Sequence, residues 1–232
     1  MKNLLIDLDH TLWDTDGNCI ATWKLMYGKY GLSEAFPDFD QLCRTYLKIN
    51  ENLWAQLPSG RVTMEFVRTE RFVRTLLSGG IDNRELAQKL SAEFMDEMQK
   101  GTRLMPYARE TLQTLRHEGY TICIATNGLH DVQTSKMTAA NIMEFVDHLF
   151  VSDTVGYMKP DVRFFNHILQ TLGCRPTDCI MIGDNPLADI MGAQSANIRT
   201  IWYNSRQVEA NVQTEQIGDL RELPQKIKEE RP

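Results

Sequence analysis

The chain has 232 residues, of which 42% are hydrophobic and 24% are charged, enough for one large domain or for a domain that carries an insert. Its formal net charge is -6 at pH 7, without the cluster of Lys and Arg that marks a nucleic-acid-binding surface, so we expect no nucleic-acid polymer as a partner. Because no apolar run approaches the roughly 18 residues of a membrane helix, we also expect no membrane association.

The first predicted element is a strand over residues 2–9, KNLLIDLD, a short apolar run typical of a parallel strand buried on both faces. Asp7 and Asp9 close this strand and point the same way, because side chains alternate along an extended chain. A hard divalent cation such as Mg²⁺ would relieve their repulsion. An aspartate can also attack phosphorus as a nucleophile while a second carboxyl protonates the leaving group. Capping of a helix or turn by either residue is the alternative.

Residues 16–100 are predicted to form a helical insert, because they contain amphipathic stretches of helix length and no convincing buried strand. An insert directly after the first strand is placed above the carboxyl edge of the sheet, where open α/β folds bind ligands. We therefore expect a lid, with a purely structural appendage as the alternative. Aromatic residues of the insert such as Trp23 and Trp54 could contact a substrate, although aromatic residues at helical spacing typically pack helix on helix.

Beyond the insert, apolar runs alternate with helical patterns. The runs predict strands at 120–126, 148–153, 179–184 and 199–204, and the patterns between them predict helices at 106–118, 130–140, 161–172 and 186–196. This alternation indicates an α/β fold, a doubly wound (Rossmann-like) parallel sheet. We expect residues 1–15 and 101–232 to form this core and residues 16–100 to form an α-helical cap domain.

Polar residues follow two of these later strands. Thr126 and Asn127 lie just before a helix, where a hydroxyl, an amide and backbone N–H groups can hold an anion. Ordinary capping of the helix by either residue is the alternative. Lys159 precedes Pro160, so its ammonium could reach a phosphate near the carboxylates, although a surface lysine before a helix-starting proline is the alternative.

Two further carboxylates belong to the segment MIGDNPLADI. Asp184 follows a predicted strand and Asp189 lies in the next helix, so both could complete a metal site, with Asp189 acting through water or by orienting its neighbours. A simple helix cap is the alternative for Asp184. The occurrence of all these residues at one edge of the sheet favours a functional site over helix capping. Residues that only cap helices would not be expected to include every part of a phosphoryl-transfer site.

The ordered segments DLDHT, ATNG, KPD and GDNPLAD resemble the four motifs of the haloacid dehalogenase superfamily, in a subfamily with a helical cap inserted after the first strand. The resemblance implies that Asp7 attacks phosphorus, that Asp9 is general acid and then base, and that Lys159 steadies the phosphoaspartate. It implies phosphate contacts from Thr126 and from backbone groups of Leu8 and Asn127. For Mg²⁺ it implies ligation by Asp7, by the backbone carbonyl of Asp9 and by Asp184, with Asp189 close behind.

Asp9 favours hydrolysis of a phosphomonoester, because the dehalogenases of this superfamily lack an acid two residues after the nucleophile. The segments ATNG and RTERF resemble the pyrimidine 5'-nucleotidase branch, which predicts nucleoside monophosphates as substrates. Phosphatases of phosphoglycolate or sugar phosphates, a phosphomutase and a non-catalytic regulatory protein are the alternatives. We expect a small phosphorylated metabolite as the partner and a monomer or small homo-oligomer. The five cysteines form no CxxC pair, which predicts reduced thiols and a cytoplasmic location.

Overall fold

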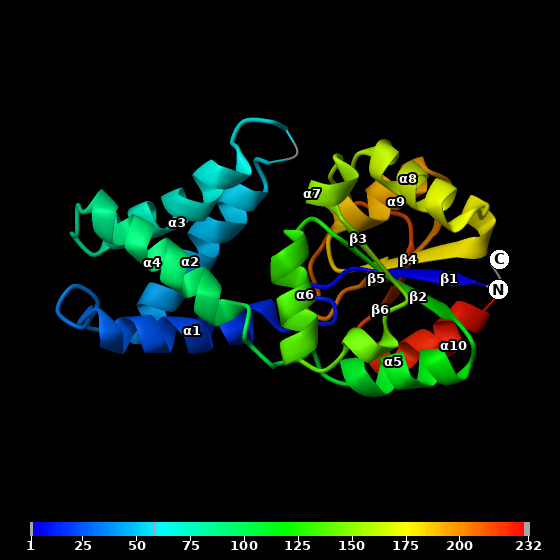
Figure 1. Ribbon diagram of the computed structural model, residues 1–232, viewed down its shortest axis with the longest axis horizontal. Coiled ribbons are helices and arrows are strands. Elements are labelled where there is room, and N and C mark those ends of the chain that lie inside the picture. The colour runs from blue at the N-terminus through cyan, green and yellow to red at the C-terminus, as the bar shows by residue number, and fades with distance from the viewer. Residues whose placement is uncertain (1, 58, 230–232) are drawn as a thin grey trace. The chain divides into compact units, whose positions relative to one another are not determined.

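The computed structural model describes residues 2–57 and 59–229 (Figure 1). The chain forms two compact units, one made of Met1–Thr15 with Thr102–Pro232 and the other of Asp16–Gly101. We call them the sheet unit and the helical unit. Residues 1, 58 and 230–232, which fall within the predicted domains, lie outside the described residues.

The sheet unit contains a six-stranded parallel sheet with the order β3-β2-β1-β4-β5-β6. Leu5 of β1 lies opposite Cys123 of β2 and Met181 of β4, and all three side chains are fully buried. Such continuous apolar runs form central parallel strands because helices cover both faces of the sheet. The strands are β1 (Asn3–Ile6), β2 (Thr121–Thr126), β3 (His148–Val151), β4 (Cys179–Gly183), β5 (Arg199–Tyr203) and β6 (Glu215–Ile217).

Helices cover the two faces of this sheet, with α8 and α9 on one side and α5 and α10 on the other (Figure 1). Phe164, Phe165 and Ile168 of α8 are fully buried in the core that also contains Leu5 and Met181. The predicted α/β doubly wound parallel fold is confirmed. The helices are α5 (Ala108–His117), α6 (His130–Ala139), α7 (Ser152–Val155), α8 (Val162–Leu172), α9 (Gly192–Ser195) and α10 (Leu223–Lys228).

The strand order reverses beside β1, because the chain continues from β1 to β2 on one side and β4 lies on the other. At such a switch point the loops that leave neighbouring strands diverge, which opens a crevice at their carboxyl ends. Asp7 directly follows β1 and Asp184 directly follows β4, so the topology itself brings the two carboxylates to this switch point.

The connections to the helical unit run side by side. Trp13 and Leu104 form an antiparallel bridge, and the Met105 amide donates a hydrogen bond of 2.9 Å to the Leu12 carbonyl. The chain therefore leaves the sheet unit and returns to it at neighbouring points.

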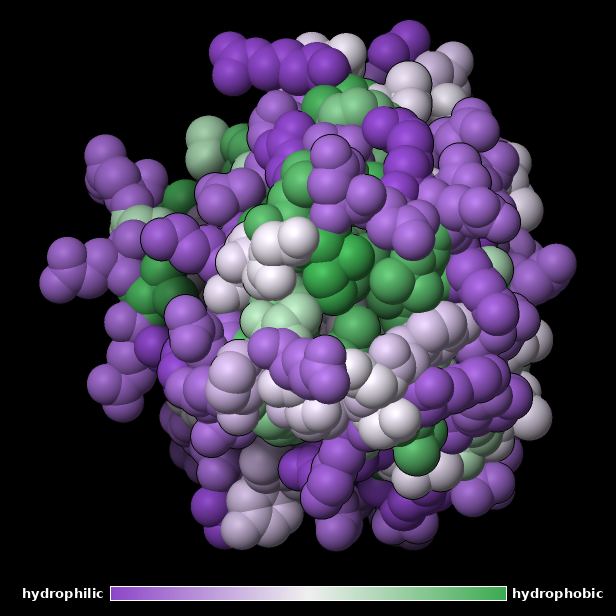
Figure 2. All heavy atoms as spheres, turned by 90° about the vertical axis from the view of Figure 1, so that its left-hand side faces the viewer, coloured by the Kyte–Doolittle hydropathy of each residue, from purple (hydrophilic) through white to green (hydrophobic). Residues whose placement is uncertain are grey.

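The helical unit consists of α1 (Thr15–Lys29), α2 (Phe39–Trp54), α3 (Met64–Ser78) and α4 (Arg84–Met98). Asp38, Thr63 and Asn83 accept hydrogen bonds from backbone amides and so cap α2, α3 and α4. Its core is aromatic, and Trp23 is fully buried, which agrees with a packing role for this side chain. Figure 2 shows apolar side chains gathered among polar ones on the face that lies on the left of Figure 1. The ring centroids of the core lie 5.1–5.7 Å apart among Trp23, Tyr46, Phe72 and Phe94.

The structure differs from the sequence prediction in several places. The strand expected over residues 2–9 ends at Ile6, before Asp7 and Asp9, and the last two residues of the strand expected over 148–153 belong to α7. The single helix expected over 186–196 is a π-helical turn, Pro186–Met191, followed by α9, because the Asn185 carbonyl accepts hydrogen bonds from both Asp189 and Ile190 amides. The edge strand β6 was also not expected, since a strand of three residues is too short to show an alternating pattern.

All five cysteines are free thiols. Within the described part of the chain, no helix combines the length and apolar character needed to cross a membrane.

Candidate active site

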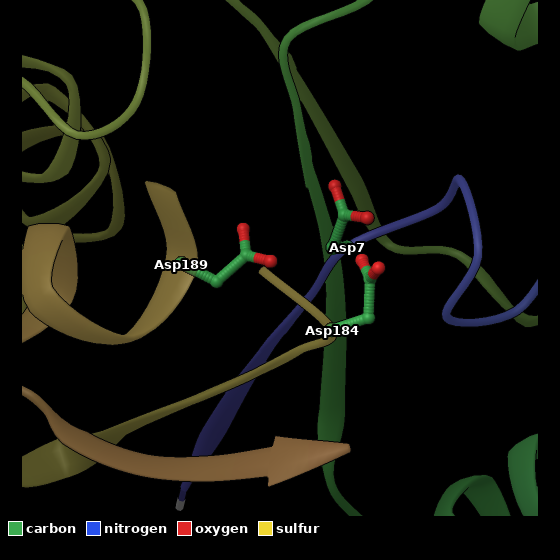
Figure 3. Close-up of side chains that lie close together, drawn as sticks. All are labelled: Asp7, Asp184 and Asp189. Atoms are coloured by element: carbon green, nitrogen blue, oxygen red, sulfur yellow. The ribbon is translucent and has the colours of Figure 1, made fainter. Parts of the chain in front are cut away.

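Three carboxylates from separate segments meet at the carboxyl edge of the sheet (Figure 3). Asp7 follows β1, Asp184 follows β4, and Asp189 lies one turn into the π-helical segment Pro186–Met191. One oxygen from each of the three lies within 4.8 Å of the others. Thr11 Oγ1 lies 3.5 Å from an oxygen of Asp7 and 3.5 Å from an oxygen of Asp184.

Lys159 is the cation that contacts two of these carboxylates. Its Nζ lies 2.7 Å from Asp7 Oδ1 and 2.5 Å from Asp189 Oδ1, and it also donates to the Ala125 carbonyl at 2.7 Å. The side chain is 2% exposed, so these contacts take the place of water around its ammonium. The Asn127 amide holds the Lys159 backbone, donating to its carbonyl at 2.9 Å and accepting from its N–H at 2.8 Å.

The charges of this cluster do not balance, because the buried ammonium of Lys159 contacts only Asp7 and Asp189, and Asp184 has the half-exposed Arg206 at 3.8 Å. Burial, together with the charges of Asp189 and Asp9, raises the pKa of Asp7 to about 7, although Lys159 acts to lower this pKa. Burial and the neighbouring carboxylates of Asp7 and Asp189 likewise hold the pKa of Asp184 well above its usual value. Burial alone would lower the pKa of Lys159, but Asp189 and Asp7 raise it, so the side chain stays an ammonium.

The donor set fits a magnesium ion. Carboxylate oxygens are the ligands that Mg²⁺ takes in proteins, and a divalent cation would supply the positive charge that this cluster lacks. Asp189 is less suited than Asp7 and Asp184 to direct ligation, because its Oδ1 accepts from Lys159 and its Oδ2 accepts from the Asn185 amide at 2.9 Å. Asp7 and Asp184 are thus the side chains that could hold the ion, with Asp189 orienting Lys159.

Asp9 has different surroundings from the other carboxylates. Its Oδ1 lies 2.7 Å from Lys136 Nζ and accepts a hydrogen bond of 2.9 Å from Thr15 Oγ1. Its Oδ2 accepts a hydrogen bond of 2.8 Å from Gln133 Nε2. Burial alone would raise the pKa of Asp9, but the charge of Lys136 and the hydrogen bonds from Lys136 and Gln133 lower it to about 2. The arrangement therefore favours the ionised carboxylate.

The predicted phosphate-binding residues lie beside these groups. The Thr126 hydroxyl ends β2, is buried, and contacts Gln133 Nε2 at 2.7 Å and the Gly128 amide at 3.3 Å. Leu8 is fully buried, and its carbonyl accepts hydrogen bonds from the Leu12 amide at 2.9 Å and from the Trp13 amide at 2.8 Å. The side chain of Asn127 is engaged by Lys159, so only its backbone could contact a phosphate.

Sequence reasoning did not select Gln133 and Lys136, although both contact a predicted catalytic residue. They occupy positions i and i+3 of α6, which places them on one face of the helix that follows Thr126. Each is at least 93% buried, which is unusual for these residue types without a polar partner. The sequence offered no signal for them, because the structure alone shows which face of α6 is buried.

Arg206 was also missed. Its Nη2 lies 3.8 Å from Asp184 Oδ2, and its side chain is 47% exposed. The Asp184 carbonyl is held from the other side by Trp202 Nε1 at 2.9 Å. Nothing in the local sequence pattern links this loop arginine to the carboxylate cluster.

Comparisons with known proteins identify related hydrolases. The family model described as haloacid dehalogenase-like hydrolase matches residues 4–203. The chain is 29% identical to pyrimidine 5'-nucleotidase PynA of Streptococcus pneumoniae over 92% of its own length and 88% of that protein. It is 26% identical to pyrimidine 5'-nucleotidase YjjG of Escherichia coli over 96% of both chains. A crystal structure of the HAD-hydrolase YfnB from Bacillus subtilis, bound to magnesium, superposes with a TM-score of 0.88 at 25% identity and covers 97% of this chain and 98% of that one.

Proposed function

Because this chain belongs to the haloacid dehalogenase-like hydrolases, we propose that it hydrolyses phosphomonoesters with Mg²⁺ through a phosphoaspartate formed on Asp7. The general activity, that of a phosphatase in this superfamily, follows from the family and from relatives that are named nucleotidases. The observation that carries the finer proposal is the buried contact of Asp7 with Lys159, beside Asp184 and Asp189.

In the first step Asp7 attacks phosphorus. Lys159 binds Asp7 Oδ1, which leaves Oδ2 as the oxygen that forms the new O–P bond. The bond between phosphorus and the leaving oxygen breaks, and Asp9 passes this oxygen a proton that it must first take up from solvent, because its contacts with Lys136 and Gln133 favour the ionised form. The Thr126 hydroxyl and the Lys159 ammonium stabilise charge on the phosphoryl oxygens.

In the second step a water molecule attacks the phosphorus of the acyl phosphate. Asp9 accepts the proton from this water, the bond between phosphorus and Asp7 breaks, and inorganic phosphate leaves with Asp7 again a carboxylate. The contacts from Lys136 and Gln133 to Asp9 support this step, because they favour the ionised form that can accept a proton.

Asp7 and Asp184, with the backbone carbonyl of Asp9, would hold the Mg²⁺ ion. When bound, the ion offsets the negative charge of the carboxylates and the substrate phosphate, so that the two can approach each other. The excess of carboxylates over buried ammonium groups in this cluster supports the assignment.

For the substrate we favour a nucleoside monophosphate. Two relatives that match over 88% or more of their length are named pyrimidine 5'-nucleotidases, which supports this choice over a phosphatase of sugar phosphates or phosphoglycolate. A cytoplasmic protein that acts on a small phosphorylated metabolite, as a monomer or small homo-oligomer, is consistent with this activity.

The test is release of inorganic phosphate from pyrimidine and purine nucleoside monophosphates, sugar phosphates and phosphoglycolate, each with and without Mg²⁺. We expect turnover only with the metal, fastest with pyrimidine nucleotides, and none in Asp7→Asn. A mutase would instead convert a sugar phosphate without releasing phosphate. Full activity of Asp7→Asn would disprove the phosphoaspartate mechanism.

A further inference from the structure

Two side chains of α6 hold the carboxylate of Asp9 from different sides. Lys136 Nζ contacts Oδ1 at 2.7 Å, and Gln133 Nε2 donates to Oδ2 at 2.8 Å. The same Gln133 nitrogen contacts the hydroxyl of Thr126 at 2.7 Å. One amide thus connects the predicted acid–base carboxylate to the predicted phosphate-binding hydroxyl.

The surroundings restrict both side chains of α6. Gln133 is fully buried, and a Cβ at Gly128 would lie only 2.5 Å from its Cδ, so the loop after β2 leaves room for this side chain and no more. The Lys136 ammonium lies 4.4 Å from the ring centroid of Trp13, which adds a cation–π contact. Burial costs these polar groups their water, and the contacts with Asp9 offset that loss.

We propose that Lys136 and Gln133 are positioning residues for Asp9, and that Gln133 sets the distance between Asp9 and Thr126. This inference rests on the proposed phosphatase mechanism and extends it to two residues that lie outside the four sequence motifs. Neither acts on the substrate directly. Each acts by fixing the direction in which the Asp9 carboxylate faces the phosphoryl group bound at Thr126.

A positioning role predicts a particular kinetic pattern. Proton transfer by a well-placed group contributes about 100-fold to 10,000-fold to a rate, so a misplaced Asp9 loses part of that factor. Binding of the phosphate depends mainly on Lys159 and the metal ion, which neither change contacts, and Thr126 keeps its place at the end of β2 although Gln133→Met removes one of its hydrogen bonds. The loss should therefore fall on kcat, with KM nearly unchanged.

The experiment measures kcat, KM and the thermal unfolding temperature for Lys136→Met and Gln133→Met, with the best substrate of the phosphate-release panel and saturating Mg²⁺. We expect kcat to fall about 10-fold or more in each variant, with KM within about 2-fold of the parent. Lys136→Arg, which keeps a cation, should recover part of the loss. If Gln133→Met does not fold, Gln133→Asn takes its place as the test variant. Gln133→Asn retains the amide but shortens the side chain, and its kcat should fall by the same factor of about 10 or more.

Two controls separate positioning from structural damage. Thr138→Met places the same residue at an exposed position of α6 and should leave kcat unchanged. In an Asp9→Asn background, Lys136→Met should add no further loss, because its effect passes through the Asp9 carboxylate. The inference is wrong if Lys136→Met and Gln133→Asn keep parental kcat while Asp7→Asn is inactive, a result that leaves the proposed function intact. It also fails if the parent protein releases no phosphate from any ester, in which case the proposed function fails with it.

Discussion

Lys159 and Asp189 form a buried ion pair, with 2.5 Å between Nζ and Oδ1 and side chains that are 2% and 1% exposed. The pair also contacts the nucleophile candidate, since the same Nζ lies 2.7 Å from Asp7 Oδ1. The lysine therefore joins the end of β1 to the segment that follows β4. One residue serves both the stability of the core and the charge balance of the site.

Lys159→Met should destabilise the fold and abolish activity. The change leaves Asp7 and Asp189 buried without their cation, and breaking a buried pair in this way costs about 3–5 kcal/mol. Chemical denaturation and phosphate release measure the two effects. Arg163→Met is the matched control, because Arg163 pairs with Asp161 in an exposed position and its loss should leave both properties unchanged. An active, equally stable Lys159→Met variant would contradict the role of this cluster.

Removal of Mg²⁺ by a chelator should abolish phosphate release, and addition of Mg²⁺ should restore it. Because an ion that binds only the folded state stabilises that state, we also expect the unfolding temperature to rise with Mg²⁺ concentration. Asp184→Asn removes one of the expected ligands, so calorimetric titration should show at least about 10-fold weaker Mg²⁺ binding, in line with loss of a metal-site contact. Unchanged affinity in this variant would exclude Asp184 as a ligand.

Gly183→Ala should lower activity even though the new side chain is small. A Cβ at this position would overlap the Asp189 carboxylate and displace the group that orients Lys159. Gly28→Ala is the matched control, since no atom lies within 4 Å of a Cβ there and Gly28 lies within α1. We expect Gly28→Ala to raise stability by about 0.5–1 kcal/mol and to leave turnover unchanged. Equal kinetics for the two variants would show that the close approach at Gly183 is unimportant.

Asp147 should contribute a pH-dependent part of stability. Burial alone would raise its pKa, but the Ile122 amide at 2.9 Å and the Arg116 guanidinium at 2.5 Å lower the pKa below its usual value. A carboxyl with a lowered folded-state pKa stabilises the fold above the unfolded value near 4, and this stabilisation disappears as pH falls through the folded value. Asp147→Asn should therefore destabilise the protein by about 1 kcal/mol at pH 7.

Urea unfolding at a series of pH values measures the difference in free energy of unfolding between the parent and Asp147→Asn. This difference should shrink below about pH 4, because protonation of Asp147 then removes the same charge from the parent. A difference that is constant with pH would mean that the carboxylate charge is not the cause. Asp147 lies far from the carboxylate cluster in sequence and contacts α5 and β2, so activity at pH 7 should be retained.

The strand ends were predictable because they depend on local patterns. Leu4–Ile6 and Ile180–Ile182 are buried on both faces, and runs of this kind are visible without knowledge of the partner strand. Once these strands are parallel, Asp7 and Asp184 must lie at the same edge. Their convergence therefore followed from the chain alone.

The contacts of α6 could not be predicted in the same way. Glutamine and lysine are also common on exposed helix faces. Only the packing of α6 against the turn around Trp13 directs Gln133 and Lys136 toward Asp9. The π-helical turn could not be predicted for a related reason. The residue types of Pro186–Met191 also suit an ordinary α-helix, and the wider turn arises from hydrogen bonds to the Asn185 carbonyl. Long-range contacts such as these have no signature in a short window of sequence.

The side-by-side course of the chain at Leu12–Met105 and Trp13–Leu104 has an evolutionary consequence. An insertion whose two ends are neighbours adds little loop-closure entropy to the host, so recombination can exchange it without disturbing the strands that flank it. Related proteins could thus acquire different inserts next to the same residues at the strand ends. New substrate preferences would then arise by exchange of the insert, without a change in the reacting groups.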